Sequence, residues 1–387
     1  MSKLLFISNI SNRISSFVTA SISAAHSLNL EFYQAANWQS AIKEQILSDE
    51  QEYGIKIKSV PISRNPLSIT NLTAYKKLVE LIQQEKIEYI HCNTPVGGIL
   101  GRLAGKKCKV NKVIYQAHGF HFYEGAPLIN WLLYYPVEKW LARYTDALIT
   151  INQEDYDLAR RKMKLRKGGK VYYVPGVGID SEKFGKASID KGAKRRELGI
   201  PEDAVLLLSV GELNQNKNHE TVIRAIADMN VYYVIAGTGE SQQHLESLID
   251  THNLQDRVKL LGFRNDVKEL YEAADIFVFP SFREGLSVAV MESMASGLPC
   301  VISRIRGNVD LIEDGVNGFL CDPRDAAAFA ERIRQLLNHP DLAAEFRRNS
   351  LEKAKRYDRR IIAEQLREIY CEMTDCMNTA AEPCGEH

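Results

Sequence analysis

Two glutamates, Glu284 and Glu292, share the stretch SFREGLSVAVMESMASGLP at residues 281–299, with seven residues between them. The pattern predicts a loop at the start of this stretch and a helix that begins near Leu286. Most of that helix is apolar, and a buried carboxylate without a partner is costly. An acid two turns inside such a helix therefore indicates a ligand that needs it.

The first turn of this helix could hold an anion. The backbone amides of Gly285, Leu286 and Ser287 would point at it, because a helix N-terminus offers unpaired N–H groups and the positive end of the helix dipole. Glu284 would then lie beside the reacting sugar if the anion is the diphosphate of a nucleotide sugar. Glu292 would lie roughly 9–12 Å further along, at about 1.5 Å per residue. There it could accept hydrogen bonds from both ribose hydroxyls.

A second segment, VGELNQNKNHE at residues 210–220, has the same organisation. A buried strand is predicted to end at Gly211, a polar loop containing Asn214 follows, and Lys217 comes just before a helix that begins near His219. The lysine could neutralise a diphosphate leaving group. A loop lysine is more commonly a solvated surface charge, so this segment alone does not decide between the two interpretations.

Histidines follow a strand of the first half, in QAHGFHF at residues 116–122. His118 is predicted at the end of that strand and His121 in the loop after it. An imidazole there could donate to a sugar hydroxyl or a phosphate, although a histidine at a strand end is often structural. Both roles stay open for His118 on this evidence.

The elements alternate between short apolar runs and amphipathic stretches of helical length, which predicts parallel sheets covered by helices. The pattern begins again after PGVGID at residues 175–180, so the chain is predicted to hold two α/β domains in tandem. Strand patterns occur at 3–8, 31–36, 55–60, 89–92, 112–118, 147–151 and 170–175, then at 204–211, 231–239, 258–262, 275–281 and 299–303.

Ligands of open α/β sheets bind beyond the carboxyl ends of the strands. Besides His118 and the loop that contains Glu284, the residues predicted there are glycines, which allow a ligand to approach the backbone closely. They are Gly211, Gly237, Gly239 and Gly262. The stretch AGTGE at 236–240 lacks the third glycine of a dinucleotide fingerprint and lies on a late strand, so it argues against a dehydrogenase.

Composition is that of a soluble globular protein, with 45% hydrophobic and 25% charged residues and a net charge of zero. Residues 1–180 carry 23 Lys and Arg against 15 Asp and Glu, a net charge of +8, and residues 181–387 carry 26 against 34, a net of −8. The basic half suits an anionic partner such as a membrane face, or reflects uneven surface charge. No aromatic-basic interleaving indicates nucleic acid.

The seven scattered cysteines favour a reduced, cytosolic setting and give no zinc spacing. The first ten residues predict a strand, too short for a signal peptide or a membrane span, so membrane contact would be peripheral. The run ARRKMKLRKGGK at 159–170 holds seven cations, which are either solvated or bind anionic lipid at about 1 kcal/mol each. The Trp- and Tyr-rich helix at 127–144 either packs on a sheet or contacts the interface.

Taken together, these segments resemble the retaining glycosyltransferases of family 4, which have the GT-B fold of two Rossmann-like domains facing across a cleft. The most specific match is FPSFREGLSVAVMESMASGLPCV, which carries the family's pair of glutamates with seven residues between them. Supporting matches are VGELNQNKNH, VKLLGFRNDVKELYEAADIFVFPS and VISRIRGNVDLIEDGVNGFL, and the segment from His118 to Ala159, with YVPGVGID, is similar to a bacterial subset that builds exopolysaccharide and capsule repeat units. The resemblance covers nearly the whole chain.

The resemblance implies a role for each site residue. Glu284 would lie by the donor sugar and Glu292 would bind the ribose. Lys217 and the amides of 285–287 would hold the diphosphate, Phe263 and Arg264 would flank the base, and His118 would face the sugar from the first domain. The remaining residues assigned to donor binding are Gly211, Asn214 and Gly237. Asn12, His121 and Arg306 are assigned to the acceptor side. The implied domains are residues 1–178 with 358–387 on the acceptor side and 179–357 for the donor.

Two departures from the family pattern affect the phosphate and acceptor sites. Glu212 stands where the family often has an arginine, and Asn214, Asn216 or Arg306 would have to replace that cation. The first loop, SNISNRISSF at residues 8–17, lacks the glycine pair of many members.

The expected activity is same-face transfer of a hexose-type sugar from a nucleotide sugar, UDP-linked by family habit, to a polyprenyl-diphosphate-linked saccharide. The family needs no metal and no further cofactor. The expected location is cytoplasmic, with peripheral contact at the anionic inner leaflet of the plasma membrane. The alternatives are a non-catalytic protein that binds nucleotide sugar or glycan within an assembly complex, and a GT-B nucleotide-sugar 2-epimerase.

Overall fold

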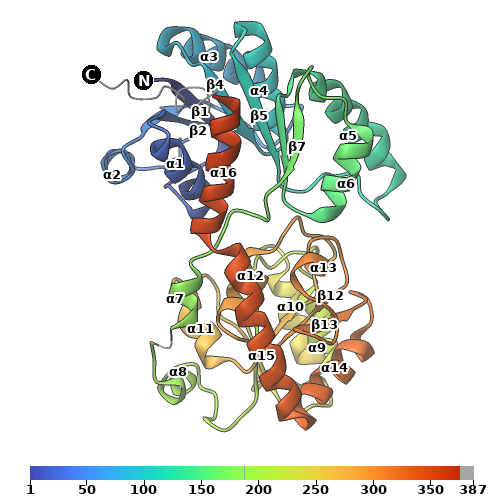
Figure 1. The fold of residues 1–387 in the computed structure, drawn as a ribbon. Helices are drawn as coiled ribbons and strands as arrows, with labels where there is room; N and C mark the ends of the chain where they lie inside the picture. The colour runs from blue at the N-terminus through green and yellow to red at the C-terminus, as the bar shows by residue number, and fades with distance from the viewer. Residues whose placement is uncertain (187, 375–387) are drawn as a thin grey trace, which may run out of the picture. The chain divides into compact units, whose positions relative to one another are not determined.

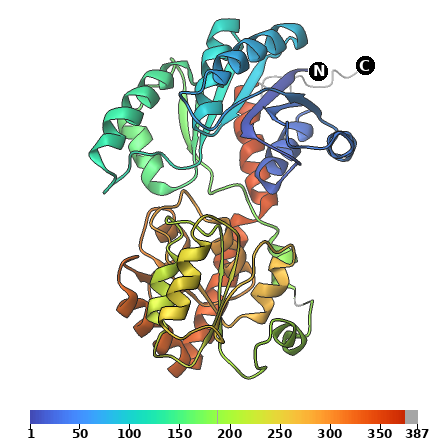
Figure 2. The ribbon, with the colours of Figure 1, turned by 180° about the vertical axis from the view of Figure 1, so that it is seen from behind.

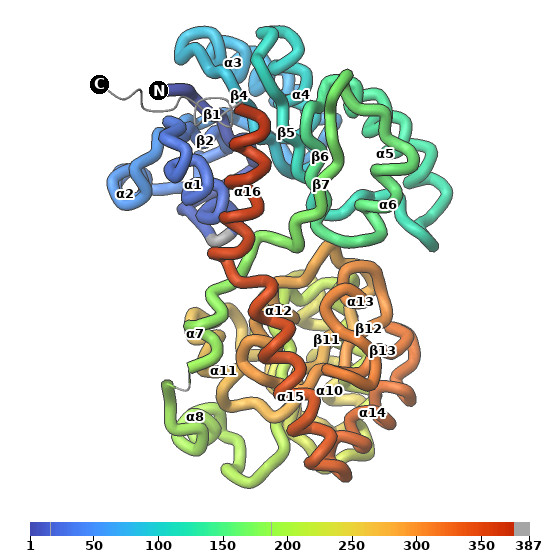
Figure 3. Tube along the Cα trace, in the orientation of Figure 1, coloured from blue at the N-terminus to red at the C-terminus, as the bar shows by residue number. Residues whose placement is uncertain are grey.

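The computed structural model describes residues 1–186 and 188–374, and the chain forms two compact units (Figures 1 and 3). The first unit contains residues 1–178 together with the chain from Arg359 onward, and the second contains Ile179–Asp358. The part of the predicted final segment beyond Thr374 lies outside the described residues. No helix of the described chain is long and apolar enough to cross a bilayer.

The first unit is built on a parallel sheet of seven strands in the order β3-β2-β1-β4-β5-β6-β7. The strands are β1 (Lys3–Ile10), β2 (Glu31–Asn37), β3 (Lys56–Ser59), β4 (Tyr89–Asn93), β5 (Lys112–Ala117), β6 (Ala147–Thr150) and β7 (Lys170–Tyr173). The helices are α1 (Ser16–Ser27), α2 (Lys43–Tyr53), α3 (Thr70–Glu85), α4 (Pro95–Cys108), α5 (Leu128–Leu141) with the 3-10 turn η1 (Ala142–Tyr144), α6 (Gln153–Lys162) and α16 (Arg359–Met373).

Helices cover both faces of this sheet, which explains why its strands are continuous apolar runs (Figures 1 and 2). Along β1, Leu5 and Ile7 face the core that includes α3 and α4. Leu4 and Phe6 face the opposite core, which contains α1 and α16. Each adjacent pair of residues in the strand is thus buried on opposite sides.

The last helix, α16, belongs to the first unit although 180 residues of the second unit precede it in the chain. Leu366 and Tyr370 are buried in the core that contains α1. The Tyr370 hydroxyl lies 2.6 Å from His91 Nδ1. Burial lowers the pKa of His91 to about 3, so this imidazole is neutral and the contact is an uncharged hydrogen bond.

The second unit is built on a parallel sheet of six strands in the order β10-β9-β8-β11-β12-β13. The strands are β8 (Leu206–Val210), β9 (Tyr232–Ala236), β10 (Val258–Leu260), β11 (Ile276–Phe279), β12 (Cys300–Ser303) and β13 (Gly318–Cys321). The helices are α7 (Ser181–Gly185), α8 (Lys191–Glu197), α9 (His219–Ala225), α10 (Gln242–Thr251), α11 (Val267–Ala273), α12 (Val288–Ala295), α13 (Asn308–Leu311), α14 (Ala326–Asn338) and α15 (Pro340–Ala354), which the 3-10 turn η2 (Lys355–Tyr357) follows.

Two details of the second unit differ from the sequence prediction. Strand β13 was missed because GFLC is only four residues long and opens with glycine. Helix α12 begins at Val288, not near Leu286, because Ser287 is its N-cap and its side chain accepts from the Val290 amide. Residues 284–287 are therefore loop, and the estimate of 9–12 Å from a continuous helical rise does not hold for them.

Candidate functional site

The strand order of the second sheet reverses between β8 and β11, which are hydrogen-bonded neighbours. Ligands of open parallel sheets bind where the order reverses, beyond the carboxyl ends of the strands. Gly211 follows β8 at this point, and the loop of Ser281–Gly285 follows β11. The two segments singled out in the sequence therefore meet at the switch point of the sheet.

Lys217 and Glu284 form an ion pair there, with 2.7 Å between Nζ and Oε1. Both side chains are mostly buried, with 20% and 14% of their surface exposed. The lysine Nζ also lies 4.7 Å from the centre of the Phe279 ring. The pair brings a cation and a carboxylate 67 residues apart in the chain to one point.

Hydrogen bonds between the two loops fix this pair. Asn216 donates its side-chain amide to the Arg283 carbonyl at 2.9 Å, and its own carbonyl accepts from the Phe282 amide at 2.8 Å. Asn218 donates to the Pro280 carbonyl at 3.0 Å. Asn218 was not among the predicted site residues, and its left-handed backbone (φ 53°) is visible only in the structure.

The three candidates for the missing cation at position 212 lie in different settings. Asn214 accepts from the Lys217 amide at 3.0 Å and donates to Glu212 at 3.0 Å, so its side chain holds the loop. Asn216 holds the β11 loop. Arg306 is the one cation of the three; it is buried in the second unit, and its Nε lies 3.5 Å from the Glu284 carbonyl.

Glycines allow these loops to pack against each other. A Cβ built at Gly237 would lie 1.8 Å from the Gly211 carbonyl oxygen, and one at Gly307 would lie 2.2 Å from the Gly285 carbonyl oxygen. These contacts leave no room for a side chain. The glycines thus set the spacing of the backbone at the switch point.

The substitution Gly237→Ala is expected to lower the free energy of unfolding by at least about 2 kcal/mol, because the β8 loop must move to admit the methyl group. Urea denaturation measures the change. Gly185→Ala is the matched control, since its Cβ would meet only an ordinary contact at 3.6 Å. Equal stability of the two variants would contradict the close approach of the loops.

Glu292 lies on α12 and is largely buried. Tyr271 donates its hydroxyl to Glu292 Oε2 at 3.2 Å, and the same hydroxyl lies 3.1 Å from the Ala289 carbonyl. Burial raises the pKa of Glu292 to about 7, although the Tyr271 hydrogen bond and the charge of Lys183 oppose the rise. An acid whose ionised form is this costly is a candidate for ligand binding.

The two residues that the family resemblance assigns to the base come after β10. Phe263 is exposed and free to stack. Arg264 is committed to carboxylates, since it donates to Asp266 Oδ1 at 2.7 Å and to Glu197 at 3.0 Å. Hydrogen bonds from Arg264 and Lys194 hold the pKa of Asp266 well below its usual range. The arginine is thus held in place by acids, which the sequence did not indicate.

In the first unit, His118 follows β5 and is held by its neighbours. Its Nε2 lies 2.9 Å from Asn93 Oδ1, and its ring lies 4.4 Å from that of Phe17. Burial lowers the pKa of His118 to about 4, so the imidazole is neutral near pH 7. A neutral imidazole whose Nε2–H donates to Asn93 keeps Nδ1 as an acceptor.

Asn93 was not predicted from the sequence. It ends β4, next to the point where the first sheet reverses its order between β1 and β4. Its side chain is fully buried, and its Nδ2 has no hydrogen-bond partner among the described residues. Thr94, which follows, has a positive φ of 65°, rare for a β-branched residue. Polar residues at the end of a buried strand were the available signal.

The two other predicted residues of the first unit lie apart from this arrangement. Asn12 is exposed in the loop between β1 and α1. His121 lies against α5, with its ring 4.7 Å from that of Tyr134, and its carbonyl accepts from Asn130 at 3.0 Å.

If the activity is the sugar transfer that the family resemblance implies, the substitution His118→Ala is expected to reduce its rate by about 10- to 100-fold, as loss of a hydrogen bond to bound substrate would. The loss should be the same at pH 6 and pH 8, because a group with a pKa near 4 does not titrate between them. Initial rates at both pH values measure it, with the exposed His26→Ala as control. A loss confined to one pH would contradict a neutral His118.

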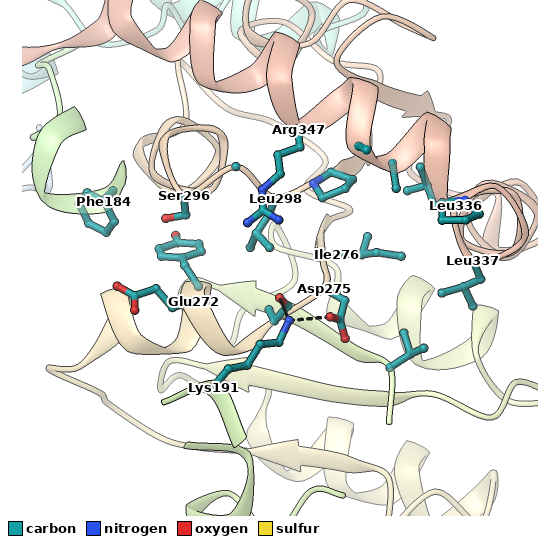
Figure 4. Close-up of a pocket in the computed structure, with 18 of the residues that line it drawn as sticks. Phe184, Lys191, Glu272, Asp275, Ile276, Ser296, Leu298, Leu336, Leu337 and Arg347 are labelled. Atoms are coloured by element: carbon teal, nitrogen blue, oxygen red, sulfur yellow. Dashed lines mark hydrogen bonds and ion pairs between the residues drawn. The ribbon is translucent and has the colours of Figure 1, made fainter. Parts of the chain in front are cut away.

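A pocket of about 670 Å³ in the second unit lies at the amino ends of the strands, opposite the edge where Lys217 and Glu284 meet (Figure 4). It is lined by residues at the amino ends of β11 and β12, such as Asp275 and Pro299, and Lys191 pairs with Asp275 there at 2.8 Å. The predicted site residues do not line it. In the described chain, no group of three or more His, Cys, Asp or Glu is placed to hold a metal ion.

Comparison with known proteins places the chain in a family. Residues 190–353 match the model described as glycosyl transferases group 1, and residues 17–152 match the model described as glycosyl transferase 4-like. The chain is 37% identical over 381 residues to a protein of Bacillus subtilis strain 168 named as a glycosyltransferase, EpsD, covering 96% of this chain and 97% of that one. The chain belongs to the family 4 glycosyltransferases.

Other glycosyltransferases support this family and its fold. A relative in Escherichia coli is named UDP-Gal:alpha-D-GlcNAc-diphosphoundecaprenol alpha-1,3-galactosyltransferase. The two chains are 32% identical over a region that covers 74% of this chain and 76% of the relative. The crystal structure of Anabaena HepE with UDP-glucose aligns over 96% of this chain and all of that chain, with a TM-score of 0.79 and 21% identity. Sucrose-phosphate synthase of Thermosynechococcus elongatus aligns over 97% of this chain and all of its own, with a TM-score of 0.81 and 19% identity. The fold is GT-B, an α/β architecture with two Rossmann-like domains.

Proposed function

We propose that this glycosyltransferase moves a hexose from a UDP-sugar, with retention of the anomeric configuration, to a polyprenyl-diphosphate-linked saccharide during assembly of a cell-surface polysaccharide. The observation that carries the proposal is the Lys217–Glu284 pair at the switch point, with the buried Glu292 further along the same segment. The name of the E. coli relative supports the donor and acceptor classes, since it specifies UDP-Gal, a diphosphoundecaprenol saccharide and an α linkage.

The donor would be held along the β11 loop and α12. Lys217 and the loop amides that precede α12, at residues 285–287, would hold the diphosphate, and the ionised Glu292 would accept from both ribose hydroxyls. Phe263 would stack on the base, and Arg306, beside the Glu284 carbonyl, would add the cation that position 212 lacks. With these cations and amides the diphosphate would need no metal ion and no other cofactor.

Transfer would follow on one face of the sugar. The acceptor hydroxyl oxygen forms a bond to C1 as the bond between C1 and the UDP oxygen breaks, and the hydroxyl proton passes to the leaving phosphate oxygen. Glu284 would position the sugar and stabilise the positive charge that develops at C1. His118, whose Nε2–H is donated to Asn93, would accept from a sugar hydroxyl through Nδ1. In the ligand-free protein Lys217 is paired with Glu284, so binding would draw the lysine toward the diphosphate.

A lipid-linked acceptor implies work at a membrane surface. We place the protein in the cytoplasm, in peripheral contact with the inner leaflet. Asn12 and His121, the proposed acceptor-side residues, lie in the first unit, whereas Arg306 lies in the second unit beside Glu284, where the diphosphate role is the better supported. Their part in acceptor binding is inferred from the family resemblance.

Two measurements test this function. A thermal-shift screen of nucleotides and nucleotide sugars should show stabilisation by UDP-sugars, because a ligand at 100 times its dissociation constant adds about 2.7 kcal/mol. The best donor, radiolabelled, is then offered to polyprenyl-diphosphate-linked GlcNAc, and label should enter the lipid fraction with wild type but far less with Glu284→Gln. Stabilisation without transfer to any lipid-linked saccharide would favour a non-catalytic binding protein, and no stabilisation would overturn the donor site.

A further inference from the structure

Helix α5 of the first unit carries apolar side chains on its outer side. Its outward positions follow a helical spacing, at i, i+1, i+4, i+5, i+9 and i+12, and form one continuous row. We call this row the outer stripe of α5; it consists of Leu128, Ile129, Leu132, Leu133, Val137 and Trp140. Between 41% and 73% of the surface of each residue is exposed. A surface helix of a globular protein normally turns such a row inward.

The inner side of α5 fixes this orientation. Trp131 and Tyr135 pack against the core of the first unit. Glu138 accepts two hydrogen bonds from Arg102, at 2.8 and 3.1 Å, and the guanidinium of this fully buried arginine lies 3.8 Å from the Tyr115 ring. Turning the stripe inward would leave that buried cation unpaired, which is strongly unfavourable. The stripe is therefore held outside.

The outward-facing charges of α5 and of the turn that follows it are positive. Glu138 is the only acid in residues 128–144, and it points inward to Arg102. Lys139 and Arg143 are exposed at the C-terminal end of α5. Lys106 reaches the same end, where it donates to the Tyr144 hydroxyl at 2.7 Å.

Aromatic rings occupy the same end of the helix. Trp140 and Tyr144 lie edge to face, 5.5 Å apart, and the Lys106 ammonium lies 4.1 Å from the centre of the Tyr144 ring. Tryptophan, tyrosine and lysine are the side chains that favour the boundary between lipid and water. An apolar row bordered by such a cluster matches a helix that lies in a membrane interface.

We infer that the outer stripe of α5 docks the protein on a bilayer that contains anionic lipid, with the helix lying in the plane of the interface. At about 1.5 Å per residue its 14 residues extend about 21 Å, too short to cross a bilayer. The inference deepens the proposed function and rests on it, because a polyprenyl-linked acceptor is embedded in such a bilayer. The stripe then brings the first unit to the membrane that holds the acceptor.

Charge selects the membrane over a second copy of this chain. Because Glu138 is turned inward, an isologous contact between two copies of α5 would offer Lys139 and Arg143 no outward-facing acid of the other helix. Anionic headgroups would instead pair with both cations. The basic run at 159–170 is a weaker candidate for this contact, because Arg166 already pairs with Asp146 and Lys170 with Glu372.

Vesicle flotation tests the docking surface. Wild type should float with vesicles of phosphatidylcholine and about a third phosphatidylglycerol, and less with phosphatidylcholine alone. The double variant Leu132→Glu, Leu133→Glu should lose more than about tenfold of this partitioning, because it removes apolar area and repels the headgroups. The matched control is the double variant Ile42→Glu, Leu47→Glu. It adds the same charge at two exposed apolar residues, the N-cap of α2 and a position within that helix, and it should float as wild type does.

The outcomes separate docking from catalysis. Equal flotation of the stripe variant and wild type, or no flotation of wild type, would overturn the inference. So would a wild-type dimer that the stripe variant converts to a monomer without any vesicle binding, since a second copy would then be the occupant. UDP stabilisation, read in the same samples, shows that the variants are folded. Its absence together with normal flotation would contradict the proposed donor site alone.

Discussion

Glu292→Gln is expected to stabilise the ligand-free protein near pH 8 and to weaken UDP binding by about 10- to 100-fold. Burial raises the pKa of Glu292 from its ordinary 4.5 to about 7. Between these two values the folded protein binds more protons than the unfolded chain, so this group makes stability fall as pH rises through that window. Above pH 7 the full cost is present, and glutamine removes it, a gain on the order of 2–3 kcal/mol.

The loss of binding has a separate cause. A carboxylate can accept hydrogen bonds from both ribose hydroxyls, whereas the neutral amide has one oxygen that accepts and an NH2 group that does not, so one bond loses its acceptor and the other becomes weaker. Because the ionised acid is the binding form, wild-type affinity for UDP should increase as pH rises from about 6 to 8. The variant should show no such increase.

Urea denaturation at pH 5.5 and pH 8 and calorimetric titration with UDP measure both effects. Glu272→Gln on α11 is the control. The Glu272 carboxylate is paired with Lys268, and this hydrogen bond helps to lower its pKa although burial acts in the opposite direction. That variant should lose stability at pH 8 and keep its UDP affinity. A Glu292→Gln protein that is less stable than wild type at pH 8, with unchanged UDP affinity, would make Glu292 a structural residue.

Lys217→Ala is expected to lower kcat by about 10²- to 10³-fold, the cost of removing a preorganised charge that stabilises a leaving group. The side chain has an aromatic ring on one side and the Glu284 carboxylate on the other, so its position is defined before substrate binds. Its removal also leaves Glu284, which is only 14% exposed, without its cation. Steady-state rates with the donor found in the screen measure the change.

Arg304→Ala provides the matched loss of one cation in the same unit, since Arg304 pairs with Asp314 at the surface. That control should keep wild-type kcat. Lys217→Arg should recover part of the activity, because the charge is retained with a different shape. If Lys217→Ala and Arg304→Ala had the same kcat, Lys217 would have no part in the departure of the leaving group.

Most of the fold could be predicted from local pattern. Continuous runs such as LLFIS at residues 4–8 predict strands buried on both faces. Of the thirteen strands in residues 1–186 and 188–374, twelve lie near their predicted positions. The sequence also placed the two site segments at the same edge of the second sheet, because each directly follows a predicted parallel strand. That β8 and β11 are neighbours depends on strand order, which no local pattern encodes.

The remainder depended on contacts between segments distant in sequence. Arg264 looked available for a base but is held by Asp266 and Glu197, the latter 67 residues away. Asn93 became a site candidate only through its hydrogen bond with the side chain of His118, which follows the neighbouring strand. The direction of the outer stripe of α5 is set by the buried Arg102, on another helix. In each case a tertiary partner, absent from the local pattern, decides the position.

The most direct test of the proposed activity is the anomeric configuration of the product. The protein is incubated with the UDP-sugar selected in the screen and a lipid-diphosphate-linked saccharide, and the proton coupling constant at C1 of the transferred sugar is read by NMR. Same-face transfer predicts the same configuration as in the donor, with product formation strongly reduced in Lys217→Ala. A product of inverted configuration would contradict same-face transfer and the proposed roles of Glu284 and Lys217.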